Sequence, residues 1–161
     1  MKTYPMWNDS SYSRPTSAFP SSGKISDPPN TLLVVDDDHE VRQLEAEILR
    51  LEGYNVLQAE SAAAALRVAA STEAIHLLIT DFVMPEVDGL ELSRRFRAVH
   101  PKTPVLMVSG SLPLLRDRNE DDLDRVELLA KPFAFNELLR KVRTLLDAAV
   151  HFPRRQPSRS D

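Results

Sequence analysis

Residues 31–53 read TLLVVDDDHEVRQLEAEILRLEG, and this stretch decides the fold. It opens with an apolar run, Thr31–Asp36, that is too short to form a helix. Apolar residues then recur at helical spacing, at Val41, Leu44, Ile48 and Leu51. Asp38 stands where a helix N-cap is expected, and Gly53 stands where the helix would stop. The pattern predicts a short buried strand followed by an amphipathic helix.

The same alternation continues downstream. The further predicted strands are Tyr54–Gln58, His76–Asp81, Pro104–Ser109 and Arg125–Ala130. The further predicted helices are Ala62–Ala70, Gly89–Val99 and Glu137–Leu146. Ser61 is the expected N-cap of Ala62–Ala70, and Asn136 is the expected N-cap of Glu137–Leu146. Strands that are apolar throughout and separated by helices are typical of a parallel sheet covered on both faces. We therefore predict an α/β fold, a doubly wound five-stranded parallel sheet with helices on both faces.

Composition and charge exclude several classes of protein. The 161 residues suit one domain with appendages, and a net charge of -4 argues against nucleic-acid binding through a broad basic surface. The absence of cysteine excludes a disulfide scaffold, a thiolate metal site and a cysteine nucleophile. No apolar run is long enough to span a membrane, and no secretory signal is present. We expect a cytoplasmic protein that binds neither nucleic acid nor membrane.

The chain divides into three parts. Residues 1–30 hold seven Ser and five Pro, which predicts a disordered leader. Residues 31–148 form the predicted domain, and residues 149–161 form a short basic tail. Between residues 31 and 150 there are 14 basic and 21 acidic side chains, so the domain is more acidic than the whole chain suggests.

Chemistry-bearing residues follow the predicted strands. The ends of the first, third, fourth and fifth strands carry Asp36-Asp37-Asp38, Asp81, Ser109-Gly110 and Lys131-Pro132 respectively. In open α/β sheets, ligands bind beyond the carboxyl ends of the strands. Converging carboxylates repel one another unless they are protonated or a cation neutralises them, and an all-oxygen site suits Mg2+. A metal held by two carboxylates, beside a third carboxylate and a lysine, is typical of sites that bind and transfer phosphoryl groups.

Four motifs, taken together, resemble the receiver domain of two-component response regulators. They are VVDD at 34–37, DFVMPEVDG at 81–89, SG at 109–110 and KPF at 131–133. Asp37, Asp81, Ser109 and Lys131 lie 44, 28 and 22 residues apart in turn, which fits the spacing of that family. The resemblance covers roughly residues 30–148 and implies the flavodoxin-like strand order 2-1-3-4-5.

The resemblance implies a role for each matching residue. Asp81 would be the phosphoacceptor. The implied Mg2+ ligands are Asp36, Asp37, Asp81 and the backbone carbonyl of Val83. The Ser109 hydroxyl and the Lys131 ammonium would bind the phosphoryl group, Gly110 would have to be small to leave the site open, and a cis peptide bond would join Lys131 to Pro132.

One residue and one segment depart from the family pattern, and two further residues stand where the family tunes the lifetime of the phosphorylated form. Leu128 stands where the family often has a switching aromatic residue, so output through that ring is in doubt. The segment 111–124 lacks a clean helical pattern, and we expect the fourth helix there to be short, displaced or mobile. Neither Val83 nor Ser111 is acidic or amidic, which predicts slow dephosphorylation rather than a turnover enzyme.

The resemblance implies a phosphoryl donor and a target. The donor would be a histidine kinase or a histidine phosphotransfer protein, and the output protein is not identified by the sequence. The residues after 150 are too few for an output domain, which favours a stand-alone response regulator of the single-domain type. Such a protein would signal by phosphorylation-dependent protein binding or pass the phosphoryl group on in a relay.

Three other functions stay open. The chain could be the receiver module, or a phosphate sink, of a hybrid kinase system. It could be a Mg2+-dependent phosphatase that passes through an aspartyl phosphate, although Val83 stands where such enzymes place a second Asp. A flavin or nucleotide binder on the same fold is disfavoured, because no Gly-rich phosphate loop follows the first strand.

Overall fold

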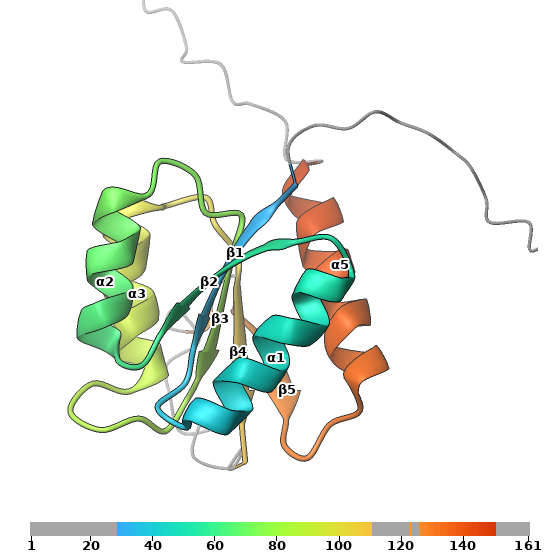
Figure 1. Cartoon of the computed structure of the whole chain (residues 1–161). Helices are drawn as coiled ribbons and strands as arrows, with labels where there is room; N and C mark the ends of the chain where they lie inside the picture. Colours follow the sequence, from blue (N-terminus) through green and yellow to red (C-terminus); the bar gives the residue numbers. More distant parts are fainter. Residues whose placement is uncertain (1–28, 111–122, 124–125, 151–161) are drawn as a thin grey trace, which may run out of the picture.

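The computed structural model describes residues 29–110, 123 and 126–150. Strands and helices alternate from β1 to β4, and β5 and α5 complete the described part of the chain (Figure 1). The strands are β1 (Thr31–Val35), β2 (Asn55–Ala59), β3 (Leu77–Asp81), β4 (Val105–Ser109) and β5 (Val126–Ala130). The helices are α1 (His39–Leu51), α2 (Ala62–Ser71), α3 (Gly89–Val99) and α5 (Phe135–Val150).

All pairings between neighbouring strands are parallel, and the strand order is β2-β1-β3-β4-β5. The predicted α/β class, the doubly wound sheet and the order 2-1-3-4-5 are therefore confirmed. The register pairs Val35 with Thr80 and Ser109 with Ala130, so neighbouring strands end at nearly the same level. Residues that directly follow these strands consequently meet at one edge of the sheet.

Helices cover both faces of the sheet, α1 and α5 on one side and α2 and α3 on the other (Figure 1). The two-residue repeat of the strands divides the core accordingly. Leu32 and Val34 pack in the cluster that includes Leu49 of α1 and Leu138 of α5. Leu33 and Val35 face the opposite side, in a cluster with residues of α2 and α3. The strand-helix alternation in the sequence thus produces two separate apolar layers around one sheet.

The buried face of α1 differs from the predicted one. Leu44 is 47% exposed and Leu51 is 87% exposed, whereas the buried residues of this helix are Glu45, Ala46 and Leu49. The predicted apolar stripe is wrong at these two leucines, because packing against the sheet turns the helix toward the neighbouring row of residues. A carboxylate is therefore buried where the sequence pattern placed a leucine.

The predicted N-caps of two helices are confirmed, and that of a third is wrong. The Asp38 side chain accepts hydrogen bonds from backbone N–H groups at the start of α1, and the Ser61 hydroxyl accepts one from Ala64. Asn136 does not cap the last helix, because α5 already begins at Phe135. The Ala134 carbonyl accepts the first hydrogen bonds there, from Glu137 and Leu138.

The predicted leader, apart from residues 29 and 30, lies outside the described residues, as does the tail beyond residue 150. The predicted fourth-helix segment, residues 111–124, also lies outside them, apart from Leu123. Helix α5 continues to Val150, two residues past the predicted domain boundary at 148. Within the part of the chain that is described, no helix is both long enough and apolar enough to cross a bilayer.

Candidate phosphoryl-transfer site

The site lies where the chain leaves two adjacent central strands. Strands β1 and β3 are neighbours in the sheet, but β1 leads into α1 on one face and β3 leads toward α3 on the other. Crevices form at such points because the two connections diverge. Asp36 and Asp37 directly follow β1, and Asp81 is the last residue of β3. The topology therefore brings the predicted carboxylates to one crevice.

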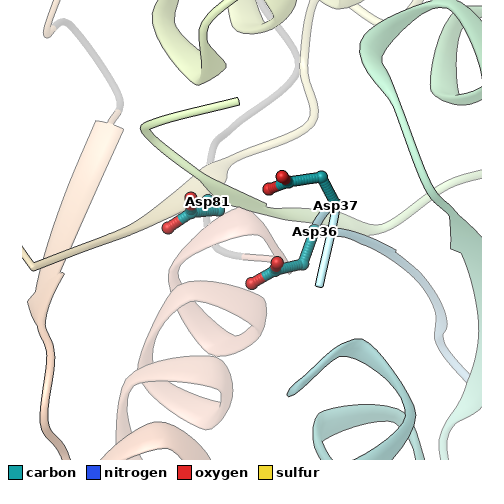
Figure 2. Close-up of side chains that lie close together, drawn as sticks. All are labelled: Asp36, Asp37 and Asp81. Atoms are coloured by element: carbon teal, nitrogen blue, oxygen red, sulfur yellow. The ribbon is translucent and has the colours of Figure 1, made fainter. Parts of the chain in front are cut away.

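Three carboxylates meet there (Figure 2). One oxygen each from Asp36, Asp37 and Asp81 lie within 4.8 Å of one another. Asp36 is buried, Asp81 is half-buried and Asp37 is exposed. The cluster therefore opens to solvent on the Asp37 side, while Asp36 forms its inner wall.

Local hydrogen bonds hold Asp36 in place. Its Oδ1 accepts a hydrogen bond from the backbone N–H of Asp38 at 2.8 Å. Its backbone carbonyl accepts one from Arg42 Nη1 at 2.6 Å. The start of α1 thus fixes both the chain and the carboxylate of Asp36.

Lys131 joins two of the carboxylates. Its Nζ donates to Asp81 Oδ1 at 3.0 Å and to Asp36 Oδ2 at 3.2 Å. Its backbone N–H donates to the Ser109 carbonyl at 2.8 Å, which continues the pairing of β4 with β5. The peptide bond to Pro132 is cis, as the resemblance implied. One ammonium against three carboxylates leaves the site with a formal charge of about -2.

The electrostatics of the site follow from burial and these contacts. Burial raises the pKa of Asp81, the hydrogen bond and charge of Lys131 lower it, and Asp36 and Asp37 raise it further, so the result is above the usual value. Burial alone would lower the pKa of Lys131, but the carboxylates of Asp81 and Asp36 outweigh it and raise that pKa. Lys131 therefore stays charged, and the surplus negative charge rests on the carboxylates.

The other predicted site residues surround this cluster. Ser109 is almost fully buried at the end of β4, and Val83 is exposed in the loop after β3. Among the described residues, an added Cβ at Gly110 would meet no atom within 4 Å, so the expected need for a small residue there stays a prediction. Leu128 packs beside the buried cluster of Phe82, Leu90 and Met107. The roles that the resemblance implies for these residues also stay predictions.

Gly89 belongs to the site and was given no role from the sequence. A Cβ at this position would lie 2.2 Å from the backbone oxygen of Asp81. Its N–H donates to the Phe82 carbonyl at 2.9 Å. Glycine thus lets the start of α3 pack directly on the backbone that carries Asp81. The signal was available, because Gly89 closes the DFVMPEVDG motif.

Glu45 is the second residue that the sequence did not single out. It is buried on α1, and burial, with the charges of Asp36 and Asp81 against that of Lys131, raises its pKa to about 7. Its place within a helical pattern gave no signal, because helical spacing alone does not tell which of two adjacent residues turns inward.

The donor set at the crevice fits a hard divalent cation. The clustered ligand atoms are carboxylate oxygens only, which is the chemistry that Mg2+ prefers. The surplus negative charge and the open side at Asp37 leave room for a cation and its water ligands.

Comparison with protein families now agrees with this geometry. The response regulator receiver domain family matches residues 32–143, which is more than half of the chain. The chain belongs to this family. The match includes the sheet from Leu32 onward and the residues that form the crevice.

Curated relatives and solved structures of other receiver domains agree with this family assignment. The response regulator receiver protein CpdR of Brucella abortus is 30% identical over 118 residues, which cover 73% of this chain and 98% of CpdR. The chain spans about half the length of other curated relatives that it matches. The solved receiver domain of the hybrid histidine kinase CckA is 32% identical, with a TM-score of 0.62 over 73% of this chain and 99% of that one.

A further solved structure bears on the metal. The response regulator TrrA of Thermotoga maritima, in complex with Mg2+ and BeF, is 31% identical to this chain. The match has a TM-score of 0.65 and covers 72% of this chain and 98% of TrrA. A protein with this fold thus holds Mg2+ together with a beryllium fluoride group.

Proposed function

We propose that this receiver domain accepts a phosphoryl group on Asp81. The donor would be the phosphohistidine of a histidine kinase or of a phosphotransfer protein. The observation that carries the proposal is the position of Asp81: it ends a central strand, lies within 4.8 Å of Asp36 and Asp37, and is hydrogen-bonded to Lys131. Membership of the receiver family supports it.

The transfer is a displacement at phosphorus. A carboxylate oxygen of Asp81 bonds to phosphorus, the bond between phosphorus and the donor imidazole nitrogen breaks, and the imidazole leaves with that electron pair. Lys131, which already contacts Asp81 Oδ1, would hold the carboxylate before the transfer and a phosphoryl oxygen after it. The Ser109 hydroxyl, at the neighbouring strand end, would bind another phosphoryl oxygen.

Asp36, Asp37, Asp81 and the backbone carbonyl of Val83 would hold Mg2+ in the crevice. The cation would offset the negative charge that otherwise repels an anionic donor. The acidic cluster supports this assignment, as does the Mg2+ complex of the related TrrA. The same cation would lower the raised pKa of Asp81 and keep its carboxylate ionised.

Phosphorylation would serve as a signal rather than as a step of a turnover reaction. It adds about 1.5 to 2 negative charges at the crevice, where Ser109 and Lys131 can respond. Movement of Ser109 toward the phosphoryl group would pull the chain that follows β4 and change the surface offered to an output protein. We place the protein among stand-alone regulators that act by phosphorylation-dependent binding or by relay, as its match over 98% of CpdR supports.

Intact-mass analysis tests the phosphoacceptor. The full-length protein is incubated with acetyl phosphate and Mg2+, beside the Asp81→Asn variant and the control Glu47→Gln, whose side chain is exposed on α1. The wild type and the control should gain one phosphoryl adduct that hydroxylamine removes, and Asp81→Asn should gain none. An adduct that persists in Asp81→Asn would reject Asp81 as the nucleophile.

A receiver module within a hybrid kinase system is the second candidate. It is favoured by the match to the receiver domain of the hybrid kinase CckA, which the chain covers almost completely. Phosphotransfer from the phosphorylated protein to a purified histidine phosphotransfer domain separates the two. Rapid and reversible transfer would favour a module that passes the phosphoryl group on within a relay, and retention of the phosphoryl group would favour a regulator that acts by phosphorylation-dependent binding.

A further inference from the structure

A groove of about 360 Å³ lies between α2, the loop that leads from β3 to α3, and α3 itself. Its wall on α2 includes Ala63, Leu66, Arg67 and Ala70. These residues follow one another at intervals of three, one and three positions, so they share one face of the helix. Because the two alanines have short side chains, they leave space between α2 and the loop. We call this hollow the α2 groove.

The α2 groove offers apolar surface to solvent. Ala63, Ala70 and Pro85 are exposed, and Leu66 and Val87 are only partly buried against the core beneath them. The outward face of a surface helix is usually polar, because it meets water. Helix α2 instead carries a single charged side chain over its whole length. Such a face favours a partner that brings apolar side chains of its own.

The charged side chains of the groove carry a surplus of positive charge. Arg67 and Arg95 line it, against Glu86 alone. The guanidinium of Arg67 has no hydrogen-bond or ion-pair partner among the described residues. Arg95 donates to Glu91 at 2.8 Å, but Glu91 also accepts from Arg94 at 3.0 Å. One carboxylate thus serves two guanidinium groups, and the groove keeps N–H donors to spare.

We propose that the α2 groove docks an acidic segment of a partner protein that also carries apolar side chains. Its carboxylates would pair with Arg67 and Arg95, since the planar guanidinium group can bind a carboxylate through two hydrogen bonds. Its apolar side chains would pack on Ala63, Ala70 and Val87.

A protein segment fits this groove better than other anions that arginine binds. Between residues 31 and 150 there are 14 basic and 21 acidic side chains, so the domain as a whole repels the phosphate backbone of a nucleic acid. A small anion would pair with the arginines but leave the apolar walls in contact with water. An acidic peptide segment with apolar side chains satisfies both parts of the lining.

The position of the groove gives this docking a role as output, and that role rests on the proposed function. Pro85 and Val87 belong to the loop that joins Asp81 to α3. At the end of this loop, Gly89 packs directly on the backbone of Asp81. A partner in the α2 groove therefore contacts the segment that follows the proposed phosphoacceptor.

Two blocked peptides test the groove on the full-length protein. The probe is acetyl-Leu-Glu-Leu-Glu-Leu-amide, and the matched peptide carries glutamine in place of both glutamates, which keeps the size and removes the charge. Binding is followed by NMR shifts of the backbone amides of Ala63, Ala70 and Val87. We expect a dissociation constant on the order of millimolar for the acidic peptide. The neutral peptide should bind about fivefold more weakly, because ion pairs near the surface strengthen binding only a few-fold each.

Three variants locate the preference. Arg67→Gln should reduce it to about twofold, since one of the two ion pairs is lost. Arg140→Gln makes the same substitution at an exposed position of α5, on the other face of the sheet, and should keep the wild-type preference. Ala70→Gln places a longer polar side chain in the groove and should weaken the binding of both peptides.

Several results would overturn the proposal. They are equal binding of the two peptides by the wild type, a preference that Arg67→Gln leaves unchanged, and the absence of shifts at the groove amides. Glutarate, a dicarboxylate without apolar side chains, should shift these amides far less than the acidic peptide at the same concentration. Equal shifts would show that the groove takes a small anion instead.

The comparison of peptides on the wild type needs no variant, so the proposal stays testable even if Arg67→Gln does not fold. It also needs no phosphoryl chemistry. Failure of the acetyl phosphate experiment would reject the phosphoacceptor and leave the peptide result standing, and a failed peptide test would leave the phosphoacceptor untouched.

Discussion

Replacement of Glu45 by Gln should change how the stability of the protein depends on pH. The pKa of Glu45 rises from 4.5 to about 7 in the folded protein, chiefly through burial. Below about pH 4.5 the carboxyl is protonated in both the folded and the unfolded chain, so it does not lower the free energy of unfolding. As the pH rises toward 7, the unfolded chain releases the proton while the folded one retains it, so stability falls.

The size of this loss follows from the difference between the two pKa values. Each pKa unit corresponds to about 1.36 kcal/mol, so a change from 4.5 to about 7 costs the folded state about 3 kcal/mol above neutral pH. Glutamine has nearly the same shape and does not titrate. The variant should therefore gain stability over the wild type as the pH rises from about 4.5, and the gain should level off above about pH 7.

Urea denaturation followed by far-UV circular dichroism measures the effect at a series of pH values. Asp81 also titrates with a raised pKa, but it is present in both proteins, so the difference between wild type and Glu45→Gln isolates Glu45. Glu47→Gln is the control, because it makes the same substitution at an exposed position of the same helix. Parallel stability curves for wild type and Glu45→Gln would refute the reasoning.

Three further predictions concern the site and its supports. Gly89→Ala should destabilise the protein by about 1 to 3 kcal/mol in urea titrations and slow phosphorylation by acetyl phosphate, because the new Cβ would meet the Asp81 backbone oxygen at 2.2 Å. Unchanged values for both would contradict this. Lys131→Ala should raise the carboxyl titration midpoint of Asp81 in carbon-13 NMR, since Lys131 lowers that pKa, and a lower midpoint would count against the pairing. Asp38→Ala should lower the free energy of unfolding by about 0.5 to 2 kcal/mol through loss of the α1 cap, and a neutral result would show that the cap is dispensable.

Local signals in the sequence located most of the elements. All five strands were predicted, and the apolar runs were clearest at β1, β3 and β4, because a strand in the middle of a parallel sheet is buried on both faces and tolerates few polar residues. Asp38 and Ser61 marked helix starts correctly, since capping depends only on the adjacent backbone. Asn136 misled, because α5 already begins at Phe135 and its first backbone hydrogen bonds go to the carbonyl of Ala134.

The sequence by itself determined the kinds of chemical groups at the site and the strand ends that carry them, because a parallel sheet brings those ends to one edge. Only the tertiary structure decided that Gly89 packs on the backbone of Asp81 and that Glu45, rather than Leu44, faces inward. Both depend on how a helix is rotated and seated against the sheet. That placement is set by close packing among residues far apart in the chain, and a helical repeat carries no record of it.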